Sequence, residues 1–124
     1  MTSKKKILII DDDSRNIFAL SAVLRARGFE CLSASGALEG ISLLNSDSEI
    51  GIVLMDMMMP DMDGYEAIDE IRSNEKIAGI PIIAVTAKAM VGDREKALAA
   101  GADNYASKPI DVDLLTNILN EHLT

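Results

Sequence analysis

Residues 7–13 read ILIIDDD, so four apolar residues are followed at once by three aspartates. The same order, an apolar run and then a polar residue, recurs in IVLMD at 52–56 and in IIAVT at 82–86. Runs that are apolar throughout, rather than at alternate positions, are typical of parallel strands covered on both faces. With two weaker runs, the predicted strands are 7–10, 30–33, 52–55, 82–85 and 104–106.

Longer amphipathic stretches separate these strands. Ser14 is a candidate N-cap for a first helix, and Gly28 and Gly101 fit the ends of the first and fourth helices. The predicted helices lie at about 14–27, 38–44, 65–71, 91–100 and after Asp111, a candidate N-cap. Strands that alternate with helices predict a doubly wound α/β domain, with a five-stranded parallel sheet and helices on both faces.

Length and composition exclude several classes of protein. The 124 residues suit one domain, and 20 acidic against 12 basic residues give a net charge of −8, which disfavours binding to nucleic acid. One cysteine and one histidine exclude a cysteine/histidine zinc site. No apolar run is long enough for a membrane span or a secretory signal, so we expect a cytoplasmic protein without a membrane partner.

Polar residues follow the predicted strands at the edge where a doubly wound sheet binds its ligands. They are Asp11 and Asp12, Asp56, Thr86 and Lys108. Two carboxylates about 4 Å apart repel by roughly 4 kcal/mol at an effective dielectric constant of about 20, so the cluster requires a cation. Oxygen ligands favour Mg²⁺ or Mn²⁺. Aspartate is also a known nucleophile for forming an acyl phosphate, which indicates phosphoryl transfer.

These motifs resemble the receiver domain of two-component response regulators, including single-domain regulators of the chemotaxis type. The resemblance rests on residues 7–13, on LMDMMMPDMDG at 54–64, on VTA at 85–87 and on GADNYASKP at 101–109. It covers essentially the whole chain, in order. It implies a flavodoxin-like strand order 2-1-3-4-5, one receiver domain over residues 1–124, and no output domain in this chain.

The resemblance also implies a role for each acidic residue. Asp56 is expected to be the phosphoacceptor. Asp12, Asp56 and the backbone carbonyl of Met58 are expected to bind Mg²⁺ directly, and Asp11 is expected to act through water. The resemblance further implies that Met58 and Lys88, two residues after Asp56 and Thr86, tune how attacking water reaches the phosphoryl group. Because a thioether is a weak hydrogen-bond partner, Met58 predicts slower self-dephosphorylation than a polar residue at this position would give.

Other residues are expected to contact the phosphoryl group or to change position in response to it. Thr86 and Lys108 are expected to contact it, and Tyr105 is expected to turn inward as Thr86 moves toward it, unless it is only a half-buried tyrosine at a sheet edge. The Lys108–Pro109 peptide bond is expected to be cis. The output surface is expected at about 91–122.

The implied function is a phosphorylation-controlled signalling module that does not turn over a separate substrate. Its phosphodonor would be a histidine kinase or a histidine phosphotransfer domain. Asn16, four residues after Asp12, and KPID at 108–111 resemble the sequences of receivers from hybrid kinases and phosphorelays. We expect an unknown downstream protein target, and either a monomer or a phosphorylation-dependent dimer. The alternative is a protein-interaction module on the same fold that is not phosphorylated. A flavin-binding protein is disfavoured because the three aspartates after the first strand would repel the phosphate of the flavin. An aspartyl phosphatase is disfavoured because such enzymes typically carry a second acid two residues after the nucleophile, where this chain has Met58.

Overall fold

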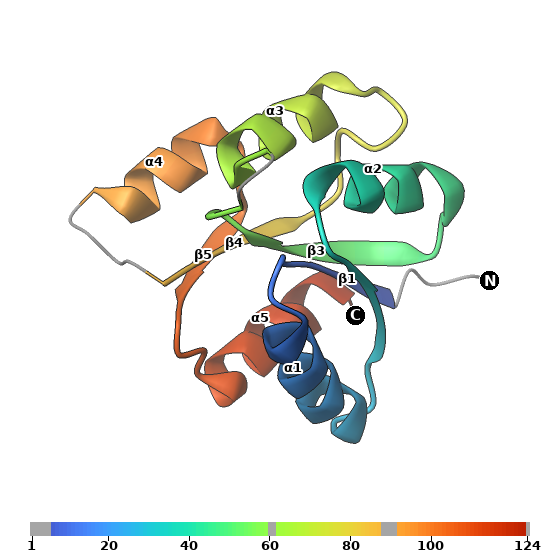
Figure 1. Cartoon of the computed structure of the whole chain (residues 1–124), viewed down its shortest axis with the longest axis vertical. Helices are drawn as coiled ribbons and strands as arrows, with labels where there is room; N and C mark the ends of the chain where they lie inside the picture. The colour runs from blue at the N-terminus through green and yellow to red at the C-terminus, as the bar shows by residue number, and fades with distance from the viewer. Residues whose placement is uncertain (1–5, 60–61, 88–91, 124) are drawn as a thin grey trace.

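The strands of the computed structural model form one parallel sheet in the order β2-β1-β3-β4-β5 (Figure 1). The structure describes residues 6–59, 62–87 and 92–123. Within these residues the strands are β1 (Lys6–Ile10), β2 (Glu30–Ala34), β3 (Ile50–Asp56), β4 (Ile82–Thr86) and β5 (Asn104–Ser107). Every residue of β3 and β4 is buried, which is why the residues before Asp56 and before Thr86 in these strands carry no polar side chain.

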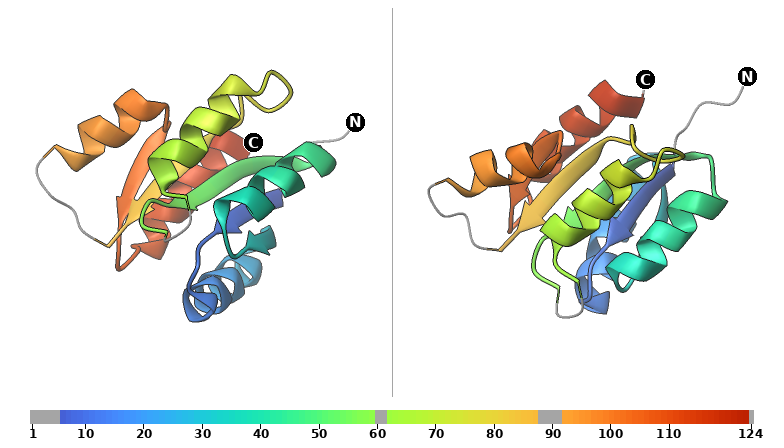
Figure 2. Two further views of the ribbon diagram at one scale, coloured as in Figure 1. Left: turned by 45° about the horizontal axis from the view of Figure 1, so that its top comes forward. Right: turned by 90° about the horizontal axis from the view of Figure 1, so that it is seen from above.

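The first four helices lie between successive strands in the chain, the fifth follows the last strand, and together they cover both faces of the sheet (Figures 1 and 2). They are α1 (Ser14–Ala26), α2 (Ala37–Ser46), α3 (Gly64–Ser73), α4 (Asp93–Ala100) and α5 (Val112–Leu123). The predicted doubly wound α/β class and the 2-1-3-4-5 order are therefore confirmed. No helix among the described residues is long and apolar enough to cross a membrane.

Two apolar cores lie on opposite faces of the sheet. On one face, α1 and α5 contribute residues such as Leu24 and Leu119. On the other face, α2, α3 and α4 contribute residues such as Leu44, Ile68 and Ala97. Because both faces are covered by apolar side chains, the polar residues of the site gather at the ends of the strands.

Some predicted boundaries were wrong by a few residues. Asp56 and Thr86 are the last residues of β3 and β4, rather than the residues that follow them. The N-cap of α1 is Asp13, whose carboxylate accepts a hydrogen bond from the backbone N–H of Arg15 at 3.0 Å, so Ser14 is the first helical residue. Val91, the predicted start of the fourth helix, lies outside the described residues.

Other predicted helix ends are confirmed. The carboxylate of Asp111 accepts hydrogen bonds from the backbone N–H groups of Asp113 and Leu114, as an N-cap does. Gly28 has φ +93° just after α1, and Gly101 has φ +121° at the end of α4. Both glycines therefore adopt backbone conformations that residues with a Cβ atom rarely adopt.

Candidate functional site

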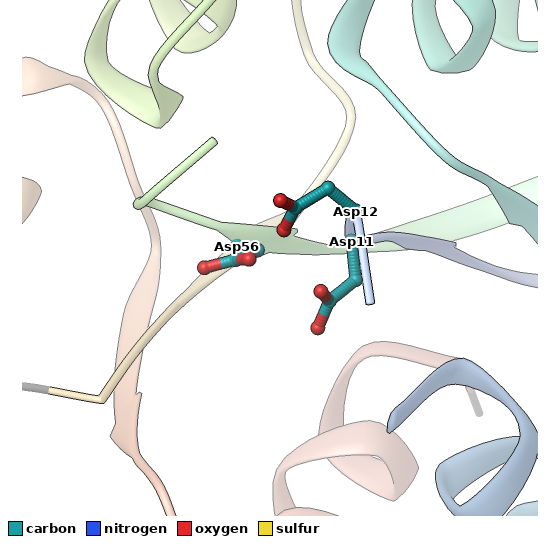
Figure 3. Close-up of side chains that lie close together, drawn as sticks. All are labelled: Asp11, Asp12 and Asp56. Atoms are coloured by element: carbon teal, nitrogen blue, oxygen red, sulfur yellow. The ribbon is translucent and has the colours of Figure 1, made fainter. Parts of the chain in front are cut away.

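Three carboxylates meet where β1 and β3 end (Figure 3). Ile10, the last residue of β1, pairs with Met55 of β3, so the residues that come next in the chain, Asp11 and Asp56, lie at the same edge of the sheet. Asp12 adds a third carboxylate, and one oxygen from each side chain lies within 4.8 Å of the others. Asp11 and Asp56 are buried, whereas Asp12 is exposed.

The protein supplies hydrogen-bond donors to both buried carboxylates. Asp11 accepts a hydrogen bond from the backbone N–H of Asp13 at 2.9 Å and another from the side-chain amide of Asn16. Asp56 accepts one from the backbone N–H of Met58 at 3.1 Å. These donors orient the two carboxylates and reduce the cost of burying them.

Burial and neighbouring charges separate the pKa values of the two buried acids. Burial raises the pKa of Asp56 to about 6, the nearby charge of Asp11 adds to this, and the Met58 N–H and the Lys108 ammonium oppose it. Burial also acts to raise the pKa of Asp11, but the donors from Asp13 and Asn16, together with Lys108, leave its pKa below the usual value. Asp11 is therefore the more readily ionised acid of the pair.

The lysine predicted after the fifth strand reaches the same cluster. Nζ of Lys108 lies 3.3 Å from Oδ2 of Asp11 and 3.9 Å from Oδ2 of Asp56. The backbone N–H of Lys108 donates to the carbonyl of Thr86 at 2.8 Å, which joins the β5 end to the β4 end. The Lys108–Pro109 peptide bond is cis, as predicted.

Thr86 and Tyr105 border a small cavity beside the acidic cluster. Its volume is about 210 Å³, and its lining residues are Met57, Met58, Tyr65, Thr86, Asp93, Lys96 and Tyr105. The side chain of Thr86 is buried, and Tyr105 is half-buried. Within the described residues, the buried hydroxyl of Tyr105 has no hydrogen-bond partner. The inward movement of Tyr105 remains a prediction.

Several contacts at the site were not predicted from the sequence. The hydrogen bond from Asn16 to Asp11 joins the first turn of α1 to the residue that follows β1. Nζ of Lys96, on α4, lies 4.7 Å from the centre of the Tyr65 ring on α3, within cation–π range. In the sequence, Asn16 was linked to the site only by its position shortly after Asp12. Lys88, which was paired with Met58 in predicting dephosphorylation, lies outside the described residues.

The donor set suits a hard divalent cation. The three clustered side chains offer only carboxylate oxygens, which are ligands that Mg²⁺ prefers, and one of them is exposed, which leaves room for water. The nearby ammonium adds a positive charge that an incoming anionic group would meet. The fold and the site together define a flavodoxin-like α/β protein with an acidic, magnesium-compatible pocket at the carboxyl ends of its strands.

The chain belongs to the response regulator receiver domain family, whose model matches residues 7–120. It is therefore a receiver domain of two-component signal transduction. This family consists of signalling proteins rather than classical enzymes. The predicted family is confirmed, and its members include both short regulators and domains within much longer kinases.

Curated relatives of both kinds resemble this chain. The chain is 37% identical to part of hybrid signal transduction histidine kinase I of Dictyostelium discoideum, over 96% of this chain but only 7% of that protein. It is 31% identical to the polar-differentiation response regulator DivK of Brucella abortus, with 96% of both chains covered. The chain thus spans a small fraction of the hybrid kinases and nearly all of the short regulator.

Solved receiver structures share the fold over almost the whole chain. A response regulator receiver protein from Pseudomonas putida has a TM-score of 0.89 and 28% identity, covering 98% of this chain and 99% of that one. The receiver domain of a sensor histidine kinase from Pseudomonas aeruginosa has a TM-score of 0.86 and 33% identity, with 98% of each chain covered. That crystal structure has a magnesium ion coordinated in its active-site cleft.

Proposed function

We propose that this receiver domain accepts a phosphoryl group from a phosphohistidine onto the carboxylate of Asp56. The observation that carries the proposal is the surroundings of Asp56, a buried carboxylate whose Oδ2 lies 3.9 Å from the Lys108 ammonium. A carboxylate in a cation-compatible pocket suits attack on an electrophilic phosphorus, because the phosphoryl oxygens need positive charge around them.

In the proposed transfer, a carboxylate oxygen of Asp56 forms a bond to phosphorus while the phosphorus–nitrogen bond of the phosphohistidine breaks. The electron pair of that bond returns to the imidazole, and Asp56 becomes an acyl phosphate. Lys108 and Thr86 would contact the phosphoryl oxygens and stabilise their charge. Later attack by water on the phosphorus would release inorganic phosphate and restore the carboxylate, so the domain acts on itself rather than on a separate substrate.

Mg²⁺, or Mn²⁺ in its place, would be held directly by Asp12, Asp56 and the backbone carbonyl of Met58, and Asp11 would act through water. When bound, the ion supplies positive charge that offsets both the crowded carboxylates and the phosphoryl oxygens. The magnesium in the related Pseudomonas aeruginosa receiver domain supports this assignment. The all-oxygen donor set of the cluster supports it independently.

The proposed phosphodonor is a histidine kinase or a histidine phosphotransfer domain, which the likeness to hybrid kinases supports. The signal would pass to a protein target through α4, β5 and α5 as Thr86 and Tyr105 respond to the phosphoryl group. Such a response is a shift between two states of the domain. We place this activity in the cytoplasm, without direct binding to nucleic acid.

Labelling with radioactive acetyl phosphate and Mg²⁺ tests the proposal. The wild-type chain is expected to acquire acid-stable, alkali-labile label, and Asp56→Asn is expected to acquire none. Asp69→Asn, a matched substitution of an exposed aspartate on α3, is the control and should label like the wild type. Label of equal intensity in Asp56→Asn would refute the assignment. Absence of label from the wild type would favour the interaction module that is not phosphorylated.

A further inference from the structure

Met58 differs from its neighbouring methionines in its exposure to solvent. Met58 is 58% exposed, whereas Met55, Met57 and Met59 are 0%, 4% and 6% exposed. Oxidants reach an exposed thioether more readily than a buried one. Among residues 55–59, Met58 is therefore the methionine available for oxidation in the folded protein.

Met58 also lies directly beside the acidic cluster. Its backbone N–H donates to Oδ1 of Asp56 at 3.1 Å, which ties its position to that carboxylate. Met58 is also one of the residues that line the cavity of about 210 Å³ bordered by Thr86 and Tyr105. A chemical change at this sulfur therefore changes the surroundings of Asp56 and leaves the three carboxylates of the cluster chemically unaltered.

We infer that Met58 is a site of reversible oxidation that controls how long a phosphoryl group stays on Asp56. The oxidant class is a two-electron oxygen donor, such as hydrogen peroxide. The sulfur lone pair attacks one peroxide oxygen, a sulfur–oxygen bond forms, the oxygen–oxygen bond breaks, and proton transfer to the departing oxygen yields water. Sulfur is oxidised by two electrons and the peroxide is reduced. The reverse step takes two electrons from a dithiol reductant, such as the thiols that serve methionine sulfoxide reductase; the dithiol becomes a disulfide and the sulfoxide oxygen leaves as water.

The product has different hydrogen-bonding properties at the same place. A thioether is a weak acceptor, whereas the sulfoxide oxygen is polar and accepts hydrogen bonds well. Beside an acyl phosphate it would hold and orient a water molecule, and oriented water attacks phosphorus faster. Oxidation is therefore expected to shorten the lifetime of the phosphoryl group. This consequence rests on the proposed function of Asp56.

The test treats the folded full chain with hydrogen peroxide and maps each methionine by mass spectrometry. Met58 is expected to oxidise several-fold faster than Met57 and Met59. The treated protein is then labelled with radioactive acetyl phosphate and Mg²⁺, the donor is removed, and the loss of label is followed. The label is expected to decay several-fold faster than in untreated protein, and methionine sulfoxide reductase should restore the slower decay.

Met58→Leu is the matched control because leucine keeps an apolar side chain of similar size. Its label should decay at the same rate before and after peroxide. Oxidation of Met57 as fast as Met58, or equal acceleration in Met58→Leu, would overturn the inference. If untreated wild type acquires no label on Asp56, both the proposed function and the effect of Met58 oxidation on the lifetime of the phosphoryl group are refuted. Label that forms but decays identically after Met58 oxidation refutes this inference alone.

Discussion

Nζ of Lys108 lies 3.3 Å from Oδ2 of Asp11, although the two residues are 97 positions apart in the sequence. The same ammonium lies slightly farther, at 3.9 Å, from Oδ2 of Asp56. Lys108 is half-buried, so its charge is screened less by water than that of a fully exposed lysine. This cation therefore stabilises the ionised form of both buried acids before any phosphoryl group arrives.

Replacing Lys108 by Met should slow phosphorylation. The substitution removes the ammonium that contacts the transferred group in the proposed mechanism, and loss of one such stabilising group costs at least about tenfold in rate. The measurement is the initial rate of labelling by acetyl phosphate at saturating Mg²⁺. Lys76→Met, at the opposite end of the strands, is the control. A Lys108→Met rate equal to that of Lys76→Met would contradict the role assigned to Lys108.

Asp56→Asn should stabilise the magnesium-free protein at alkaline pH. Folding raises the pKa of Asp56 from 3.8 to about 6. This carboxyl therefore contributes stability that is fully present below pH 3.8 and is lost as the pH rises through about 6. An uncharged Asn avoids that loss, which corresponds to roughly 2–3 kcal/mol in the free energy of unfolding.

Urea unfolding with a chelator present checks this pH dependence. The advantage of Asp56→Asn over the wild type should be large at pH 8 and should shrink toward pH 4. Asp69→Asn, which alters an exposed aspartate, should show no comparable trend. An advantage of Asp56→Asn that is the same at every pH would mean that ionisation of Asp56 is not its cause.

Adding Mg²⁺ should raise the thermal midpoint of unfolding, because an ion that binds only the folded state stabilises it. At an ion concentration about ten times the dissociation constant, the gain is about 1.4 kcal/mol. Asp12→Asn should reduce the gain, since Asp12 supplies one of the three clustered carboxylates. Asp12 is exposed, so the substitution itself should cost little. An undiminished magnesium effect in Asp12→Asn would exclude this residue as a ligand.

Gly64→Ala should destabilise the protein and disturb the site. A Cβ atom at Gly64 would lie 2.3 Å from Sδ and 2.7 Å from Cα of Met57, the residue next to Asp56. Because one of these contacts is with backbone, the start of α3 must move, at a cost of about 1–3 kcal/mol. Urea unfolding measures this cost. Gly79→Ala is the control, since its Cβ meets nothing within 4 Å, and equal stabilities for the two variants would contradict the expectation.

Arg72→Met should destabilise the end of the sheet opposite the acidic cluster. Arg72 donates to the carbonyls of Ala78, Ile80 and Gly101 and forms an ion pair with Asp103 at 2.9 Å. Loss of these hydrogen bonds leaves carbonyl groups without their donor, which should cost about 2 kcal/mol or more.

Arg94→Met is the matched control for Arg72→Met because Arg94 is exposed on α4. Both variants are compared by urea unfolding at neutral pH. The Arg72 variant should unfold at lower urea, while labelling of Asp56 by acetyl phosphate in the folded protein should persist. Equal midpoints for the two variants would show that the Arg72 hydrogen bonds add nothing to stability.

Local patterns along the chain were enough to predict the elements and the residues that end them. Short runs of consecutive apolar residues are typical of parallel strands covered on both faces, so the strands ending near Asp11, Asp56 and Thr86 were predictable. Their polar ends, together with the resemblance, indicated the acidic cluster. Boundaries were less predictable, because Asp13 and Ser14 are both good N-caps and only the folded backbone selects Asp13.

The tertiary structure alone decided which distant groups touch, and how closely. The contact of Lys108 with Asp11 depends on the ends of β1 and β5 approaching one edge, and the Asn16 contact depends on how α1 leaves β1. The exposure of Met58 beside three buried methionines likewise depends on packing. Composition and spacing describe the chain locally, whereas side-chain direction, burial and electrostatic coupling arise only when strands distant in sequence become neighbours.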